Sequence, residues 1–138
     1  KNYLETTTRT VGKSDTDGGG TESLSDRIWL PSGTEMGLPT NFTEGSQLSE
    51  FSSDSSRQAL ITDAAASHFS VSPGYHSYWL RTPYDANSAC NVKIINSNGS
   101  SSGNGAFFGQ YGVRPLCNLD SSVLFLADVD ADNCYTLY

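Results

Sequence analysis

Charged residues are scarce in this chain of 138 residues, and basic residues are the scarcest of them. Asp, Glu, Lys and Arg make up only 17% of the chain, and 8 Lys and Arg stand against 15 Asp and Glu, for a net charge of −7. A protein that binds a nucleic-acid backbone needs clustered Lys and Arg side chains, which this composition does not supply. We therefore expect no nucleic-acid partner.

Long apolar runs, a leader pattern and paired cysteines are also missing. No run approaches the roughly 20 apolar residues that a membrane-spanning helix needs, so we expect no membrane insertion. The chain starts at Lys1 without a leader pattern, which suggests a part of a longer protein whose upstream region is unknown. Cys90, Cys117 and Cys134 form no CxxC pair, and their odd number leaves at least one thiol unpaired within the chain. The sequence does not choose a disulfide among them.

Small polar residues and aromatic residues supply what the chain does contain. Ser, Thr, Asn and Gly dominate the composition, and they are poor residues for helix interiors. The 2 Trp, 7 Tyr and 6 Phe are enough to build a core, which argues against disorder. Length and composition together predict one loop-rich domain of β or α+β class.

Local patterns predict short strands and one helix. A helix is predicted from Ser55, where Ser55 and Gln58 fit a capping box, to about His68. Asn98-Gly99 predicts a two-residue hairpin turn. Residues 13–25 are expected to form a flexible connection or long loop, and residues 34–51 a loop with at most one helical turn. Strands are predicted over residues 3–11, 27–30, 78–81, 91–95, 113–119, 123–127 and 134–137.

Two motifs match catalytic or metal patterns only in part. Residues 99–103 spell the GxSxG pattern of a serine hydrolase, but that pattern needs a preceding strand and a following helix, which the sequence does not predict. Asp128, Asp130 and Asp132 alternate as in a calcium loop, but Asn133 replaces the required glycine. An acidic turn is the preferred interpretation, and calcium binding there stays open. We otherwise expect no metal and no cofactor.

The segment 84–111 has the composition of a binding loop. It is rich in Asn, Ser, Gly, Tyr and Phe, and such residues combine large aromatic contact area with adaptable hydrogen bonding. The flanking segments 78–83 and 112–116 are expected to form a rigid frame. Arg81 and Arg114 are expected to brace this frame by binding loop carbonyls or carboxylates.

The segments WLRTP (79–83) and GVRPL (112–116) together resemble a domain of unknown function found in phage structural proteins and gut bacterial proteins. DRIWLPS (26–32) with Glu35, and Glu44-Gly45 leading to Phe51 and Arg57, resemble its earlier blocks. The resemblance implies an α+β, C-type-lectin-like fold of the formylglycine-generating-enzyme type, with short antiparallel strands, one or two helices and long loops. It implies a lectin-like domain over residues 25–138, preceded by a lead-in, or first strand and linker, over residues 1–24.

The same resemblance extends to phage receptor-binding proteins diversified by retroelements. In those proteins the variable positions come just before a glycine-hydrophobic-arginine block. The corresponding candidates for ligand binding here are Tyr84, Asp85, Asn87, Asn91, Asn96, Asn98, Asn104, Phe107, Phe108, Gln110 and Tyr111. One sequence does not tell whether these positions are diversified.

The resemblance implies a non-enzymatic module that binds a host surface glycan or protein. Its expected place is a phage tail or head fibre, or else a bacterial cell surface, with other virion proteins as neighbours and a homo-oligomer as an open option. The alternative is a structural or decoration domain that binds another structural protein. A third hypothesis, an enzyme of the formylglycine-generating type, requires a reactive cysteine.

Overall fold

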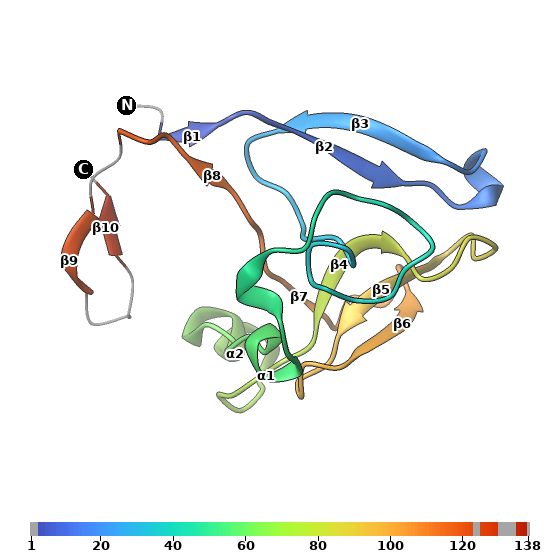
Figure 1. Cartoon of the computed structure of the whole chain (residues 1–138). Coiled ribbons are helices and arrows are strands. Elements are labelled where there is room, and N and C mark those ends of the chain that lie inside the picture. The colour runs from blue at the N-terminus through green and yellow to red at the C-terminus, as the bar shows by residue number, and fades with distance from the viewer. Residues whose placement is uncertain (1–2, 123–124, 130–134, 138) are drawn as a thin grey trace.

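The computed structural model describes residues 3–122, 125–129 and 135–137, and it confirms the predicted α+β class (Figure 1). No helix in these ranges combines the length and apolar character needed to cross a bilayer. The helical segments are η1 (Asp15–Asp17), η2 (Ser49–Phe51), α1 (Asp54–Arg57) and α2 (Asp63–Phe69). The strands are β1 (Leu4–Glu5), β2 (Thr7–Gly12), β3 (Thr21–Asp26), β4 (Tyr78–Pro83), β5 (Asn91–Ile95), β6 (Ser101–Gly105), β7 (Gly112–Val113), β8 (Asn118–Leu119), β9 (Phe125–Val129) and β10 (Tyr135–Leu137).

A sheet of four strands in the order β6-β5-β4-β7 organises the domain. Strand β5 is antiparallel to both of its neighbours, and β7 runs parallel to β4. The predicted strand at residues 91–95 is confirmed as β5. The chain turns to β6 at the predicted place, but the predicted two-residue turn is wrong: the Asn96 amide donates to the Ser100 carbonyl, so the turn consists of residues 97–99, in which Gly99 has a positive φ and Asn98 does not. The two frame segments therefore lie side by side, with Tyr78 opposite Gly112 and Trp79 opposite Val113.

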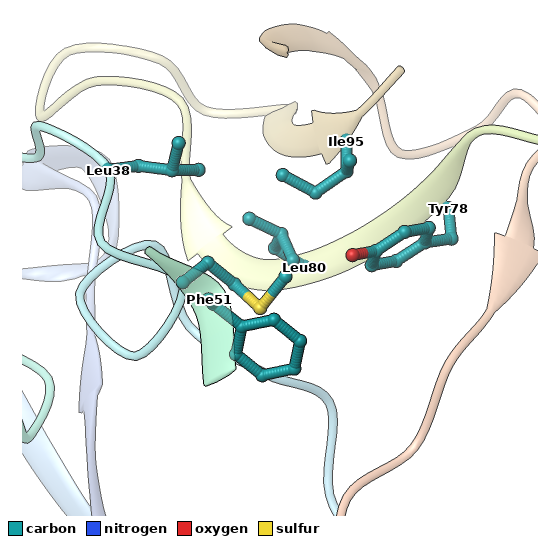
Figure 2. Packing of buried hydrophobic residues seen from close by; sticks show 6 residues of the cluster. Leu38, Phe51, Tyr78, Leu80 and Ile95 are labelled. Atoms are coloured by element: carbon teal, nitrogen blue, oxygen red, sulfur yellow. The ribbon is translucent and has the colours of Figure 1, made fainter. Parts of the chain in front are cut away.

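The apolar core covers one face of this sheet. Alternate residues of β4 point inward, so that Tyr78 and Leu80 lie on the core side, where Ile95 of β5 joins them (Figure 2). Side chains from the loop 31–51 complete the cluster. Its members are Met36, Leu38, Phe51, Tyr78, Leu80 and Ile95.

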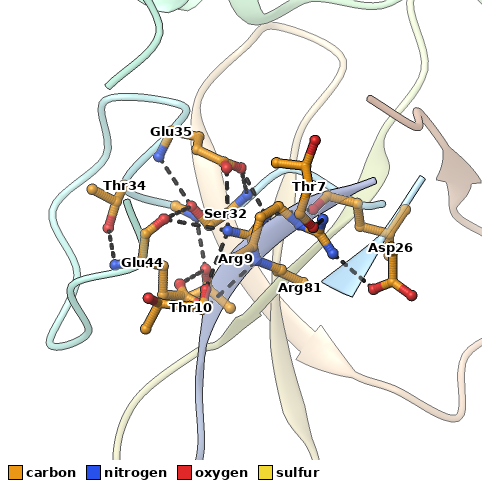
Figure 3. Close-up of polar contacts among 12 residues, drawn as sticks. Thr7, Arg9, Thr10, Asp26, Ser32, Thr34, Glu35, Glu44 and Arg81 are labelled. Carbon is orange, nitrogen blue, oxygen red and sulfur yellow. Dashed lines mark hydrogen bonds and ion pairs between the residues drawn. The ribbon is translucent and has the colours of Figure 1, made fainter. Parts of the chain in front are cut away.

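A buried polar network centred on Arg81 fixes the loop 31–51 to β4. The Arg81 guanidinium donates to both carboxylate oxygens of Glu35, at 2.7 and 3.2 Å, and to the carbonyl oxygens of Leu30, Thr10 and Glu44 (Figure 3). The Glu44 carboxylate is fully buried and accepts hydrogen bonds from the Gly12 amide and the Thr82 hydroxyl. The predicted bracing role of Arg81 is confirmed.

The structure corrects one loop prediction and one strand prediction near the N-terminus. The long loop expected over residues 13–25 is wrong, because β3 pairs with β2 along its whole length. All six β3 residues are exposed and mostly polar, so they lack the alternation that marks a strand in a sequence. Strand β3 also crosses the expected domain boundary at residue 24. The strand predicted over residues 27–30 is wrong too, since that segment makes only one bridge, between Trp29 and Leu116.

The predicted helix is also corrected: it is two short helices. The capping box that begins α1 is formed by Ser53 and Ser56 rather than by Ser55 and Gln58. The chain leaves the helix at Gln58, and α2 begins again after its own cap, Thr62. The apolar spacing suggested one helix, but Leu60 instead bridges to Tyr75 outside any helix. The helical turn expected within residues 34–51 is confirmed as η2.

Candidate functional site

Two aromatic rings lie directly over glycine positions of β6. A β-carbon at Gly103 would come within 2.1 Å of the Tyr84 ring, and one at Gly105 within 2.6 Å of the Phe107 ring. These glycines are two residues apart in one strand, so both rings cover the same face of the sheet. Any larger residue at either position would displace the ring above it.

Phe108 extends this surface. Its ring contacts that of Phe107, with centroids 4.6 Å apart and planes tilted by 39°. Phe107 is 75% exposed, Tyr84 44% and Phe108 43%. We call these three residues, Tyr84, Phe107 and Phe108, the aromatic platform. Single exposed apolar side chains are common on protein surfaces, but a contiguous exposed patch is typical of an interaction site.

Polar side chains of β5 border the platform on the same face. Lys93 stands opposite Gly103, and its amine lies 5.3 Å from the centre of the Tyr84 ring. Burial lowers the pKa of the Lys93 amine below its usual value, although the charges of Asp85 and Glu44 raise it in part. Asn91 stands opposite Gly105, the glycine that the Phe107 ring covers. The structure therefore brings Tyr84, Asp85, Asn91 and the two phenylalanines into one region.

Two other predicted residues lie on the opposite face of the sheet. The Tyr111 ring packs edge-on against Trp79, with centroids 4.9 Å apart, and its hydroxyl accepts a hydrogen bond from the Asn104 side chain. Asn104 alternates with Gly103 and Gly105 along β6, so its side chain points away from the platform. These two residues support the loop that carries Phe107 and Phe108 rather than joining the platform.

The remaining predicted residues are dispersed. Asn96 and Asn98 bind Ser100 within the β5–β6 turn, at the end of β6 that is remote from Gly105. Asn87 is exposed in the loop after β4, where its amide binds the Asp85 side chain. Gln110 is exposed and lies near Tyr111 beside a separate cavity.

Sequence reasoning missed the role of the strand beneath the platform. Residues 101–105 read SSGNG, which resembles a loop because it contains no branched or aromatic side chain. The available signal was the spacing of Gly103 and Gly105, which leaves one strand face without side chains. Lys93 was also missed, although the alternation of β5 placed it on that face.

No group of three or more His, Cys, Asp or Glu side chains is placed to hold a metal ion within the described ranges. The calcium pattern at Asp128, Asp130 and Asp132 lies outside the residues whose side chains the structure describes. Cys90 and Cys117 are exposed free thiols, and Cys134 also falls outside that part.

The second predicted brace, Arg114, is confirmed by its contacts. Its Nη1 donates to the carbonyl oxygens of Arg57 and Gln58, at 3.1 and 3.3 Å, and to the Tyr78 hydroxyl. The Tyr78 hydroxyl in turn donates to the Arg57 carbonyl at 2.6 Å. This group joins β7, β4 and the end of α1 into one frame.

We expect Tyr78→Phe to lower the free energy of unfolding by about 1–2 kcal/mol at neutral pH, because it removes a buried hydrogen bond. Burial raises the pKa of the Tyr78 phenol above its ordinary value of 10.0, although Arg114 lowers it in part. The native phenol therefore contributes stability that is present below pH 10 and is lost as the pH rises beyond it. Denaturant unfolding of both proteins between about pH 8 and about pH 11 should show the difference narrowing. A difference that stays constant would contradict this assignment.

Fold and site together define a small α+β domain whose sheet displays an aromatic surface beside a braced frame. The chain belongs to the family described as domain of unknown function (DUF6273), which matches residues 1–121. Comparisons with curated proteins and with solved structures give no significant match.

Proposed function

We propose that this chain is a non-enzymatic recognition module that binds a host surface glycan or protein through the aromatic platform. The observation that carries the proposal is the joint exposure of Tyr84, Phe107 and Phe108: two of these rings lie over glycines of β6, and the third packs against Phe107. Water contact at three neighbouring rings is unfavourable, and a ligand that covers them would recover hydrophobic free energy.

A sugar is the ligand class that this surface suits best. The apolar C–H face of a pyranose ring stacks on flat aromatic side chains, while its hydroxyl groups need polar partners at the edge. Asn91 borders the rings on the same face and is half-buried, so its side chain offers such a partner, whereas Lys93 is buried beside the Tyr84 ring. A single shallow site of this kind binds weakly, so several copies on one particle would supply the avidity.

The proposed setting is a phage virion, on a tail or head fibre, with a bacterial cell surface as the other location. The proposed fold relationship is to C-type-lectin-like domains. Two observations support it: the α+β architecture is consistent with such a fold, and the WLRTP and GVRPL segments pair in parallel at the base of the displayed loop. In this arrangement the frame holds the loop ends while the loop residues are free to vary.

A structural or decoration domain remains the second candidate, and one observation favours it. Every residue of β3 is exposed, and among the described strands β3 pairs only with β2. An exposed strand edge can accept a strand from another protein. A virion protein that copurifies with the domain, together with no binding to cells or glycans, would favour this candidate over the first.

The test measures binding of the purified chain to an array of bacterial surface glycans and to intact bacterial cells. We expect Phe107→Ala with Phe108→Ala to weaken binding by about tenfold or more, because central aromatic side chains dominate such contacts. Ile28→Ala is the matched control, since Ile28 is 57% exposed and does not belong to the platform.

Binding that is unchanged by the double variant would remove the platform from the site. An equal loss in Ile28→Ala would point to a general effect of removing exposed apolar side chains, and it would count against the platform as well. Circular dichroism and thermal unfolding of each variant establish that the fold is retained.

A further inference from the structure

A second apolar feature lies apart from the platform, between α2 and β7. It is a cavity of about 660 Å³, within the range of small-molecule sites. Four large exposed apolar side chains line it: Leu60 at 69%, Phe69 at 52%, Tyr75 at 51% and Val113 at 68% exposed. The residues come from three segments, 58–65, 69–78 and 110–115, so the tertiary fold alone assembles the cavity.

The cavity carries a positive charge and no negative one. Arg114 lines it, and none of the other described residues that line it is Asp or Glu, although the chain contains 15 of these residues. The Nη1 atom of Arg114 is engaged with two carbonyl oxygens and the Tyr78 hydroxyl. The guanidinium also lies over the rings of Phe51 and Tyr78, with its carbon 5.2 and 5.6 Å from their centres. Among the described residues, no hydrogen bond engages its Nε or Nη2 atom, and no carboxylate lies within ion-pair distance.

This contrasts with the other half-buried or buried arginines that the structure describes. Arg9 pairs with Asp26, Arg57 with Asp54, and Arg81 with Glu35. A guanidinium at the wall of an apolar cavity is poorly screened and presents N–H donors in a geometry that suits a carboxylate. The N–H groups of Arg114 that make no hydrogen bond within the described residues therefore suit a carboxylate from a ligand.

We propose that this cavity binds an apolar monocarboxylate, whose carboxylate pairs with Arg114 and whose hydrocarbon body covers Leu60, Phe69, Tyr75 and Val113. The same chemistry occurs in a free aliphatic or aromatic acid and at the C-terminus of a peptide that ends in an apolar residue. The site is independent of the aromatic platform, because it lies against α2 and β7 rather than on β6.

The experiment titrates the isotope-labelled chain with 4-phenylbutyrate and follows backbone amide shifts by NMR. We expect shift changes to concentrate in the three lining segments. The neutral amide of the same acid should bind about tenfold more weakly or worse, because it cannot form the charged pair with Arg114. Equal affinity of acid and amide, or no binding of either probe or of the peptide below, would overturn the proposal.

A short peptide ending in Leu-Phe, with a free or an amidated C-terminus, separates the two sources of the carboxylate. If 4-phenylbutyrate binds and the peptide does not, the cavity is a small-molecule site. If the peptide with a free C-terminus binds, the cavity is a site for a peptide C-terminus. Either result supports the proposal when the amidated form of the same probe binds more weakly.

Leu60→Asp provides the matched variant, because Arg114→Met would also remove hydrogen bonds that brace the frame. A carboxylate at position 60 should repel the ligand and lower affinity by about tenfold, whereas Leu24→Asp on β3, also an exposed leucine, should leave affinity unchanged. Equal losses in both variants would contradict the assignment.

Sedimentation of the native chain and of Leu60→Asp completes the test. If the native chain forms a dimer that Leu60→Asp dissociates, and no carboxylate binds, the cavity is the contact site of a second copy of the chain, and the ligand proposal is overturned.

Discussion

Arg81→Met is expected to lower the free energy of unfolding by about 3–5 kcal/mol, because it leaves buried carboxylates without their cation. Glu44 is fully buried and Glu35 is 8% exposed, so neither carboxylate can regain much hydration. Three carbonyl oxygens also lose their donor. A loss of this size is a large share of the stability of a typical domain.

Urea denaturation of the native chain, Arg81→Met and Lys13→Met measures this effect. Lys13 is a suitable control because its side chain is only half-buried and makes no ion pair within the described part of the chain. Adding Glu35→Gln to Arg81→Met should restore part of the lost unfolding free energy, because it removes one of the buried carboxylates that the first substitution leaves without a cation. A loss below about 1 kcal/mol in Arg81→Met would show that the network contributes little to stability.

Gly99→Ala is expected to cost about 3 kcal/mol or more, for two separate reasons. Gly99 has a φ of +86°, a conformation that costs an L-residue roughly 1–2 kcal/mol. A β-carbon there would also lie 1.7 Å from the carbonyl oxygen of Asp54, so the turn and α1 could not keep their contact. That contact matters because Arg57 Nε donates to the Gly99 carbonyl at 3.1 Å.

Gly18→Ala separates the two costs. Gly18 has nearly the same φ, +89°, but nothing lies within 4 Å of the position of its β-carbon. The difference in unfolding free energy between the two variants therefore measures the steric conflict with Asp54. Equal losses in Gly18→Ala and Gly99→Ala would show that the turn and α1 move apart at no measurable cost in the free energy of unfolding.

Where local rules apply, the sequence predicted the structure well. Strand β5 and its alternation, the strand β4, and the position of the turn at Asn98-Gly99, though not its length, follow from patterns contained within a few residues. The bracing roles of Arg81 and Arg114 were also predicted, because a buried guanidinium must find acceptors nearby. The prediction of one helix was wrong, because the helical spacing of apolar residues continues through Leu60. In the structure Leu60 lies between the two short helices and bridges to Tyr75.

The candidate site was predicted only as a region. The segment 84–111 does contain the exposed rings, but its residues divide between the two faces of the sheet and the β5–β6 turn. A side chain's face depends on the register of its strand, and residues 101–105 gave no sign of being a strand. Tyr84 and Phe107 became neighbours because Gly103 and Gly105 lie on one side of β6.

The sequence by itself determined the class of this domain, its short strands and its aromatic, weakly charged loop, because composition and local periodicity act over a few residues. Tertiary structure alone decided which carboxylates Arg81 meets, with Glu35 lying 46 residues away along the chain, and that Arg114 pairs with no carboxylate among the described residues. It also decided which rings are exposed together and which apolar side chains enclose a cavity. These features depend on contacts between distant segments, and no local pattern encodes the partner of a side chain across such a separation.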